Sequence, residues 1–159
     1  MEWPEPVERV AAFLRGAGAE TRLEEFARET PTAAAAAEVI GCDPAQVVKS
    51  LVLICDGKPL VALVPGDRRA DLAKIARAAG GEQARVASPQ EVESATGFVA
   101  GAVAPFPLPS VDRVLVERTL LAQDVVWVGA GSSRHMVSLA PAELVRLARA
   151  QPVDAVSDG

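Results

Sequence analysis

Five stretches of the chain combine a helical spacing of apolar residues with helix start or stop signals. The first covers residues 6–17 and stops at two glycines. The second starts at Thr30-Pro31, where threonine is the expected N-cap and proline the first helical residue, and Gly41 ends it. Residues 71–79, 88–96 and 141–150 make up the remaining three.

Two longer apolar runs, residues 47–55 and 59–64, have strand character instead. Asp56-Gly57-Lys58 separates them, and Asp-Gly is a strong signal for a tight hairpin. Shorter strands are expected at residues 20–26, 84–87, 113–117, 124–128 and 135–139. We expect residues 129–133 to form a turn and residues 154–159 to fray.

Hairpin-linked strands with helices between them predict a mixed α/β (α+β) fold, with a central, largely antiparallel mixed sheet surrounded by helices. At 159 residues the chain is expected to form a single domain over residues 1–159. Half of the residues are apolar, which is enough for a full core.

Charge and composition exclude several classes of protein. The net charge of −5 argues against a general coat for nucleic acids, so DNA is not an expected partner. No apolar run is long enough to span a membrane, and the acidic first residues do not resemble a signal peptide, so we expect a cytoplasmic protein. Two cysteines and one histidine do not make a zinc site, and none of the common nucleotide-binding or hydrolase motifs occurs, so no metal or cofactor is expected.

Lys49 is one of only three lysines and stands inside the apolar run of residues 47–55. An ammonium group there needs a partner or an exit to water. One interpretation is a lysine at the start of a strand with its head in solvent. The other is a cation in a pocket that takes a phosphate, a carboxylate or a developing oxyanion.

Three further features each allow an ordinary structural interpretation and a functional one. Residues 97–109 mix two glycines and three prolines with apolar residues, a composition typical of a loop that lines a site. Within it, Gly101-Ala102-Val103-Ala104-Pro105 could offer free backbone N–H groups to a ligand. Gly129-Ala130-Gly131-Ser132 could leave room for one, and His135 could bond a hydroxyl or act through water.

Basic residues gather in residues 66–85, which carry five basic and three acidic side chains in an acidic chain. The ordinary interpretation is a solvated helix face. If RNA binds, its phosphates are expected at Arg68, Arg69, Lys74 and Arg77.

The order of these motifs resembles a known family. V-V-K-S-L-V-L around Lys49, then T-G-F-V-A-G-A-V-A-P and V-G-A-G-S-S-R-H-M-V-S-L-A-P, is similar to the YbaK/ProX family, the free-standing relatives of the editing domain inserted in bacterial prolyl-tRNA synthetases. Members often carry a tyrosine or histidine before Thr30, and here that segment has neither. Ala102 and Met136 also differ from some members, so the sequence leaves the amino-acid preference open.

The resemblance implies a trans-editing deacylase that hydrolyses mischarged tRNA, with tRNA(Pro) carrying a small wrong amino acid as the expected substrate, without a metal. Its partners would be the aminoacyl-tRNA 3′ end and, as a candidate, prolyl-tRNA synthetase. Lys49 and Gly101 are the implied catalytic positions. The implied substrate-binding residues are Thr30, Gly97, Phe98, Ala102, Val103, Ala104, Pro105, Gly129, Gly131, Ser132 and His135.

Two alternatives stay open on the same fold. One is a non-catalytic module that binds tRNA ends or aminoacyl-adenosine. The other is a hydrolase of small esters in which His135 acts as the base.

Overall fold

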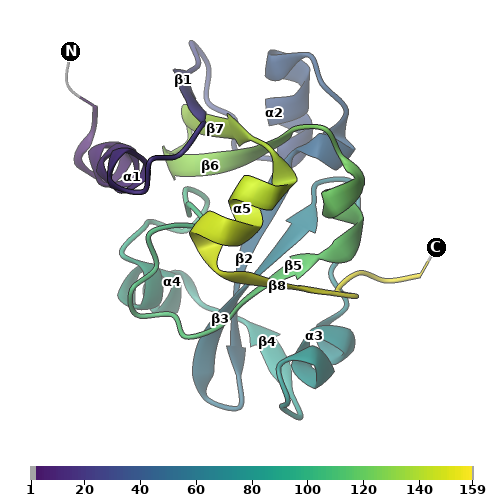
Figure 1. The fold of residues 1–159 in the computed structure, drawn as a ribbon. Helices are drawn as coiled ribbons and strands as arrows, with labels where there is room; N and C mark the ends of the chain where they lie inside the picture. The colour runs from purple at the N-terminus through teal and green to yellow at the C-terminus, as the bar shows by residue number, and fades with distance from the viewer. Residues whose placement is uncertain (1–2, 159) are drawn as a thin grey trace.

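The computed structural model describes residues 3–158, which form two β-sheets with helices around them (Figure 1). The larger sheet has the strand order β4-β2-β3-β5-β8, built from Ala84–Val86, Val48–Cys55, Lys58–Pro65, Val114–Glu117 and Ala150–Val153. The smaller sheet has the order β1-β7-β6, from Arg22–Glu25, His135–Leu139 and Val126–Ser132. Helices flank both sheets: α1 Glu5–Gly16, α2 Ala33–Ile40, α3 Leu72–Ala78, α4 Pro89–Thr96 and α5 Pro141–Ala148, with short 3-10 turns η1 Pro44–Gln46 and η2 Arg118–Ala122.

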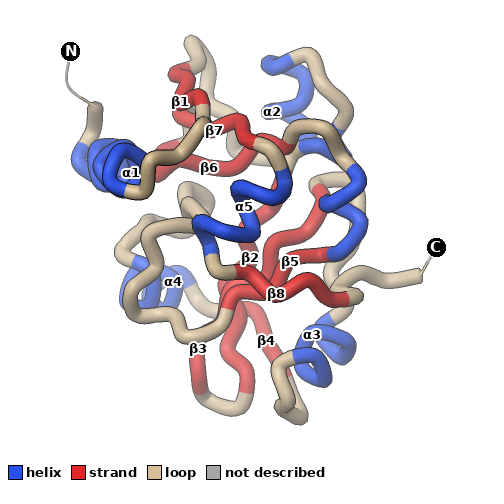
Figure 2. Tube along the Cα trace, in the orientation of Figure 1, coloured by secondary structure: helices blue, strands red, loops and turns tan. Residues whose placement is uncertain are grey.

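The mixed α/β architecture expected from the sequence is confirmed, with two sheets in place of one. In the larger sheet β4, β2 and β3 pair antiparallel, whereas β5 and β8 pair parallel with their neighbours. The smaller sheet is antiparallel throughout. In Figure 2 the strands of the smaller sheet lie above those of the larger one. The two sheets meet where Val47, just before β2, forms an isolated bridge with Trp127 of β6.

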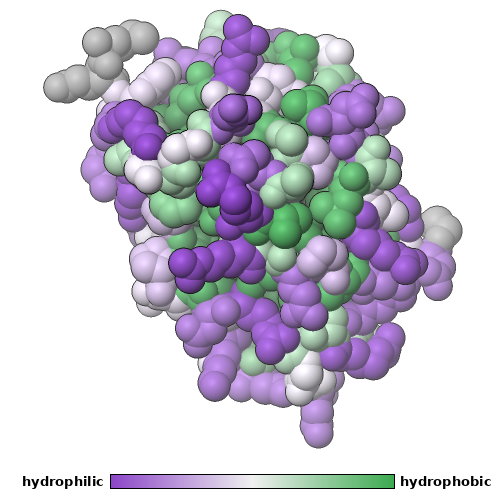
Figure 3. Space-filling view, in the orientation of Figure 1, coloured by the Kyte–Doolittle hydropathy of each residue, from purple (hydrophilic) through white to green (hydrophobic). Residues whose placement is uncertain are grey.

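Strand β3 explains why its sequence is apolar at almost every position. Val61 and Leu63 pack into one core cluster, while Leu60, Ala62 and Val64 pack into another on the opposite face of the sheet. A strand covered on both faces needs apolar residues in both registers. The outer surface seen in Figure 3 is mostly hydrophilic, with apolar side chains showing over the middle of that face.

Most predicted boundaries are confirmed. The Asp56-Gly57 hairpin joins β2 and β3. Ser88 caps α4 through a capping box with Glu91, because its hydroxyl accepts the Glu91 N–H while the Glu91 carboxylate accepts the Ser88 N–H. Gly41 ends α2 in the left-handed conformation.

Three predictions about local structure are wrong. Thr32, not Thr30, caps α2, since its side chain accepts the Ala35 N–H at 3.1 Å. Residues 129–132 do not form a turn, because an irregularity in the pairing lets β6 continue to Ser132 opposite His135. Residues 154–158 do not fray, because Ala155 and Val156 are buried and the preceding residues form β8, which the sequence pattern did not reveal. Gly159, the last residue of that prediction, lies outside the described residues.

Candidate functional site

A cavity of about 320 Å³ lies where the two sheets meet. One side, here called the lysine wall, consists of residues 48–51 of β2 and of Val47, the position before the strand. The opposite side, the histidine wall, is Gly129, Ser132, His135 and Met136 of β6 and β7. The remaining lining residues come from the start of α2 and the loop after α4: Thr30, Pro31, Thr32, Ala33, Ala36, Gly101, Ala102 and Val103.

Lys49 lies on the lysine wall and is half-buried. Its Nζ donates to the carbonyl oxygen of Arg68 at 3.2 Å. Among residues 3–158 no carboxylate lies within ion-pair distance of this ammonium group. The cation is therefore held by a neutral acceptor, and its charge is available to an anionic or polarised group that enters the cavity.

The loop around Gly101 reaches the cavity from the end of α4. Gly101 is exposed and has a φ of 87°, a left-handed conformation that favours glycine. The Ala102 N–H donates to the Val99 carbonyl oxygen at 2.9 Å and so is used within the loop. Within the described residues this leaves the N–H groups of Gly101 and Val103 as the donors that a ligand could meet.

Gly129 lets this loop pack closely against the histidine wall. A Cβ atom at position 129 would lie 2.9 Å from the carbonyl oxygen of Val103, closer than a carbon atom normally approaches. The absence of a side chain thus sets the distance between the strand and the loop. Any larger residue would push Val103 into the cavity or away from it.

A chain of polar contacts runs along the histidine wall. Ser132 Oγ lies 2.5 Å from His135 Nδ1, and the Arg134 N–H donates to the same oxygen at 3.0 Å. After accepting from Arg134, the Ser132 hydroxyl keeps a proton and a second lone pair, so it can donate to an unprotonated Nδ1 or accept from a protonated one. Nε2 lies 3.3 Å from Glu25 Oε2, close enough for electrostatic attraction but without good hydrogen-bond alignment.

His135 is only 3% exposed, and the edge of its ring meets Trp3 at a centroid distance of 5.2 Å. Burial lowers the pKa of His135 below its ordinary value, and the neighbouring charge of Arg134 lowers it further. The carboxylate of Glu25 acts in the opposite direction. A neutral imidazole is the form that can accept the Ser132 proton.

One polar residue at this site, Ser50, was not predicted from the sequence, and a predicted one, Thr30, uses its hydroxyl within the protein. Ser50 Oγ is buried and has no hydrogen-bond partner within residues 3–158, so it is a polar group that a ligand could satisfy. Its position next to Lys49 in the sequence is the feature that could have identified it as a site residue. Thr30 lines the cavity, but its hydroxyl donates to the Ser133 carbonyl oxygen at 2.9 Å, which joins the start of α2 to the turn before β7.

The cavity brings together eight residues named from the sequence: Thr30, Lys49, Gly101, Ala102, Val103, Gly129, Ser132 and His135. Five others do not line it. Phe98 and Ala104 are fully buried in the core, and Pro105 lines a different hollow beside α1 and α5. Gly97 ends α4 against Arg9, and Gly131 packs against Pro6 at the start of α1.

The four basic residues proposed as phosphate contacts differ in their surroundings. Arg69 and Arg77 are exposed. Arg68 is half-buried and donates from its guanidinium group to the Ser157 carbonyl oxygen at 2.8 Å. Lys74 forms ion pairs with Asp154 and Asp158, and these contacts, Asp158 first, raise the pKa of its ammonium group.

Among residues 3–158, no group of three or more His, Cys, Asp or Glu side chains is arranged to hold a metal ion. Within the same residues no helix is both long and apolar enough to cross a membrane.

Comparison with known proteins gives a consistent result. The sequence profile of the aminoacyl-tRNA editing domain matches residues 27–147. The Escherichia coli (strain K12) protein named multifunctional Ser/Thr-tRNA deacylase ProXp-y is 30% identical over 152 residues, which cover 92% of this chain and 90% of that protein. The Enterococcus faecalis protein EbsC, named as a candidate Cys-tRNA(Pro)/Cys-tRNA(Cys) deacylase, is 26% identical and covers 76% of this chain and 74% of its own length.

Proline–tRNA ligase from Nitratidesulfovibrio vulgaris is 32% identical over 130 residues, but the match spans only 22% of that enzyme's length. A crystal structure described as a proposed trans-editing enzyme for prolyl tRNA synthetase superposes with a TM-score of 0.91 at 32% identity, covering 99% of this chain and 100% of the other.

Proposed function

We propose that this chain, which belongs to the family of aminoacyl-tRNA editing domains, is a trans-editing deacylase that hydrolyses the ester between a wrong amino acid and the 3′-terminal adenosine of a tRNA. Family membership confirms the resemblance predicted from the motifs and, with it, an editing domain with hydrolase relatives. The observation that carries the proposal for this chain is the cavity in which Lys49 and the Gly101 loop face Ser132 and His135. We assign one such domain to residues 1–159.

The chemistry needs no strong protein nucleophile, because an aminoacyl ester is already an activated bond. Water adds to the carbonyl carbon, the tetrahedral intermediate collapses, and the bond to the ribose oxygen breaks as that oxygen takes up a proton. Lys49 supplies positive charge to the carbonyl oxygen or to the terminal phosphate. The N–H groups of Gly101 and Val103 are donors for the developing oxyanion.

Groups of the substrate complete the reaction. A ribose hydroxyl next to the ester assists the attacking water. If the amino acid is cysteine, its own thiol is a second possible nucleophile and gives a cyclic product instead of the free amino acid. No protein side chain then has to form a covalent intermediate.

The size and lining of the cavity support a small amino acid. A volume of about 320 Å³ is at the low end of the range for ligand pockets, roughly 300–1,000 Å³. Besides Lys49, the two walls carry the polar groups of Ser50, Ser132 and His135. We infer that tRNA(Pro) carrying a small wrong amino acid is the substrate, and that the exposed Arg69 and Arg77 bind its phosphates. We also infer that the protein works in the cytoplasm and that prolyl-tRNA synthetase is its partner.

The test is a panel of tRNA(Pro) samples charged with alanine, serine, threonine or cysteine, with proline as the control. Release of at least one wrong amino acid, with Pro-tRNA(Pro) left intact, supports the proposal. If the protein binds a non-hydrolysable aminoacyl-adenosine analogue but deacylates no member of the panel, it is a binding module and not an enzyme.

The contacts among Ser132, His135 and Glu25 favour one second candidate, a hydrolase of small esters in which imidazole activates the serine. The Ser132 hydroxyl would attack the ester carbonyl, His135 would take its proton, and water would then release the acyl group from Oγ. Hydrolysis of p-nitrophenyl acetate that is lost in Ser132→Ala, together with no activity on any mischarged tRNA, would establish this function instead.

A further inference from the structure

We propose that residues 154–158, the C-terminal clamp, position the ammonium group of Lys49 by holding the backbone of residues 66–71, the anchor loop. The catalytic consequence rests on the proposed function, because it takes Lys49 as the cation that acts on the ester. The structural part, that the clamp sets where Lys49 points, can be tested without any enzymatic activity.

The clamp and the anchor loop are joined through their backbones. The Asp71 N–H donates to the Ala155 carbonyl oxygen at 2.9 Å, and the Ser157 N–H donates to the Arg69 carbonyl oxygen at 2.9 Å. Between these two bonds, Ala70 and Val156 face each other as an antiparallel bridge. The clamp and the anchor loop therefore pair with each other over a short antiparallel stretch.

The clamp is itself anchored in the protein interior. Ala155 and Val156 are at most 3% exposed and belong to the core cluster that includes Ile75 of α3. The Ala155 N–H donates to Oε1 of the buried carboxylate of Glu117 at 2.8 Å. Burial alone would raise the pKa of Glu117, but the N–H groups of Ala155 and Thr119 hold it below its ordinary value.

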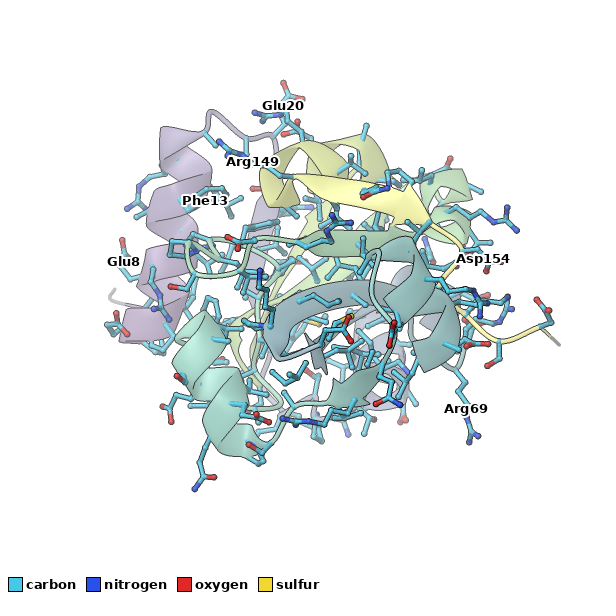
Figure 4. All side chains as sticks on the ribbon, turned by 90° about the horizontal axis from the view of Figure 1, so that it is seen from below. Glu8, Phe13, Glu20, Arg69, Arg149 and Asp154 are labelled. Atoms are coloured by element: carbon cyan, nitrogen blue, oxygen red, sulfur yellow. The ribbon has the colours of Figure 1, made fainter. Side chains whose placement is uncertain are left out.

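Lys74 adds a charged lock from α3. Its Nζ donates to the Val156 carbonyl oxygen at 2.9 Å and pairs with Asp158 at 2.9 Å and Asp154 at 3.2 Å. In Figure 4 Asp154 and Arg69 lie at the same end of the molecule, at the far side from Glu8 and Phe13 of α1. One of the three lysines, Lys74, which the sequence predicted as a phosphate contact, thus holds the clamp in this structure.

Arg68 connects the clamp to the cavity. Its guanidinium group donates to the Ser157 carbonyl oxygen at 2.8 Å, and its own carbonyl oxygen accepts from Lys49 Nζ at 3.2 Å. Within the described residues this carbonyl is the acceptor that fixes the lysine. At the other end of the loop, the Gly66 N–H donates to the Val47 carbonyl oxygen at 2.7 Å, so the loop is held at both ends and its middle presents the acceptor.

The test uses two substitutions at one position. Ser157→Pro removes the N–H that bonds to Arg69, whereas Ser157→Ala keeps it and serves as the matched control, since the clamp uses only the backbone of Ser157. Lys49 is read out by trace acetylation with acetic anhydride and mass spectrometry. Lys58, exposed at the β2–β3 hairpin, provides the internal reference in the same molecule.

In Ser157→Pro we expect acetylation of Lys49 relative to Lys58 to rise by roughly fivefold, the size expected for one lost backbone hydrogen bond. We expect kcat for deacylation to fall about tenfold with little change in KM, because the cation is misplaced and not removed. Ser157→Ala should match the wild type in both measurements.

An unchanged acetylation ratio in a folded Ser157→Pro protein overturns the clamp, whatever the activity. If the acetylation ratio changes in Ser157→Pro but the wild-type protein deacylates no mischarged tRNA, the clamp is retained and the proposed function is rejected. If Ser157→Pro does not fold, Lys74→Met takes its place, because it removes the charged lock without altering the backbone; an unchanged Lys49 ratio in that variant likewise overturns the proposal.

Discussion

The two walls of the cavity hold their polar groups in opposite ways. On the lysine wall, Lys49 has a single neutral acceptor, the Arg68 carbonyl oxygen, and its side chain is half-buried. On the histidine wall, His135 is almost completely buried and is contacted on three sides by Ser132, Glu25 and Trp3. One wall presents a charge held by one neutral acceptor, and the other presents a buried imidazole held by several side chains.

This difference suggests that the two walls have different roles in the reaction. A charge that is positioned by a carbonyl and has no carboxylate partner can stabilise an oxyanion as it forms without first breaking an ion pair, which favours ester hydrolysis. A locked hydrogen-bonding group is suited to distinguishing one small side chain from another, because it cannot adapt to a wrong one. We therefore expect substitutions on the lysine wall to change the rate most, and substitutions on the histidine wall to change binding and stability.

Lys49→Ala tests the lysine wall and should have the largest effect. Removing an electrostatic donor of this kind typically lowers kcat by about 10²–10³, and we expect that loss here with unchanged folding. Single-turnover deacylation of the best mischarged tRNA measures it. Lys58→Ala, which removes a lysine from the exposed hairpin, is the control and should retain wild-type activity. A fully active Lys49→Ala protein would show that the lysine wall does not determine the rate.

Gly129→Ala tests the fit between the histidine wall and the Gly101 loop. The added Cβ would meet the Val103 carbonyl oxygen at 2.9 Å, so the strand and the loop must separate. We expect KM to rise about tenfold and the free energy of unfolding to fall by about 1–3 kcal/mol, the usual cost of overpacking. Gly16→Ala is the control, because nothing lies within 4 Å of a Cβ there. Wild-type KM in Gly129→Ala would show that the loop moves freely.

The sequence predicted the parts of this site that depend on local order. The Asp56-Gly57 hairpin, the Ser88 capping box and the apolar strands follow from neighbouring residues, and the family motifs located Lys49 and the Gly101 loop. Glu25, Ser50 and the C-terminal clamp were not predicted, because their roles depend on contacts between distant segments. Glu25 meets His135 only through the pairing of β1 with β7.

The failed predictions have the same origin. In the sequence, residues 154–158 look like a polar end that frays. In the structure, Glu117 at the end of β5 and Lys74 of α3 supply partners for their backbone and carboxylates. Phe98 and Ala104 stand in a loop that lines a cavity, but their side chains point into the core instead. A motif therefore identifies a segment that forms a site without identifying which of its side chains face the ligand.

Glu25→Gln tests the contact between Glu25 and His135 on the histidine wall and should have the smallest effect. Burial already puts the pKa of His135 below the ordinary value of 6.5, and Glu25 opposes that shift. Protonation therefore favours the unfolded chain: the stability that neutral His135 provides is present above pH 6.5 and declines as the pH falls toward its folded pKa. Without the Glu25 carboxylate the folded pKa falls further, so the decline extends over a wider range of pH.

We expect the Tm of Glu25→Gln to match the wild type at about pH 7.5 and to fall below it by a few degrees at about pH 5.5. Glu24→Gln is the control, since Glu24 is the neighbouring position on β1 and pairs with Met136 instead of His135. Adding His135→Gln to both backgrounds should abolish the difference between them, because no imidazole then remains to titrate. If the pH dependence of Glu25→Gln persists in that double variant, the carboxylate acts on stability by another route, and the histidine wall is held by burial and Ser132 alone.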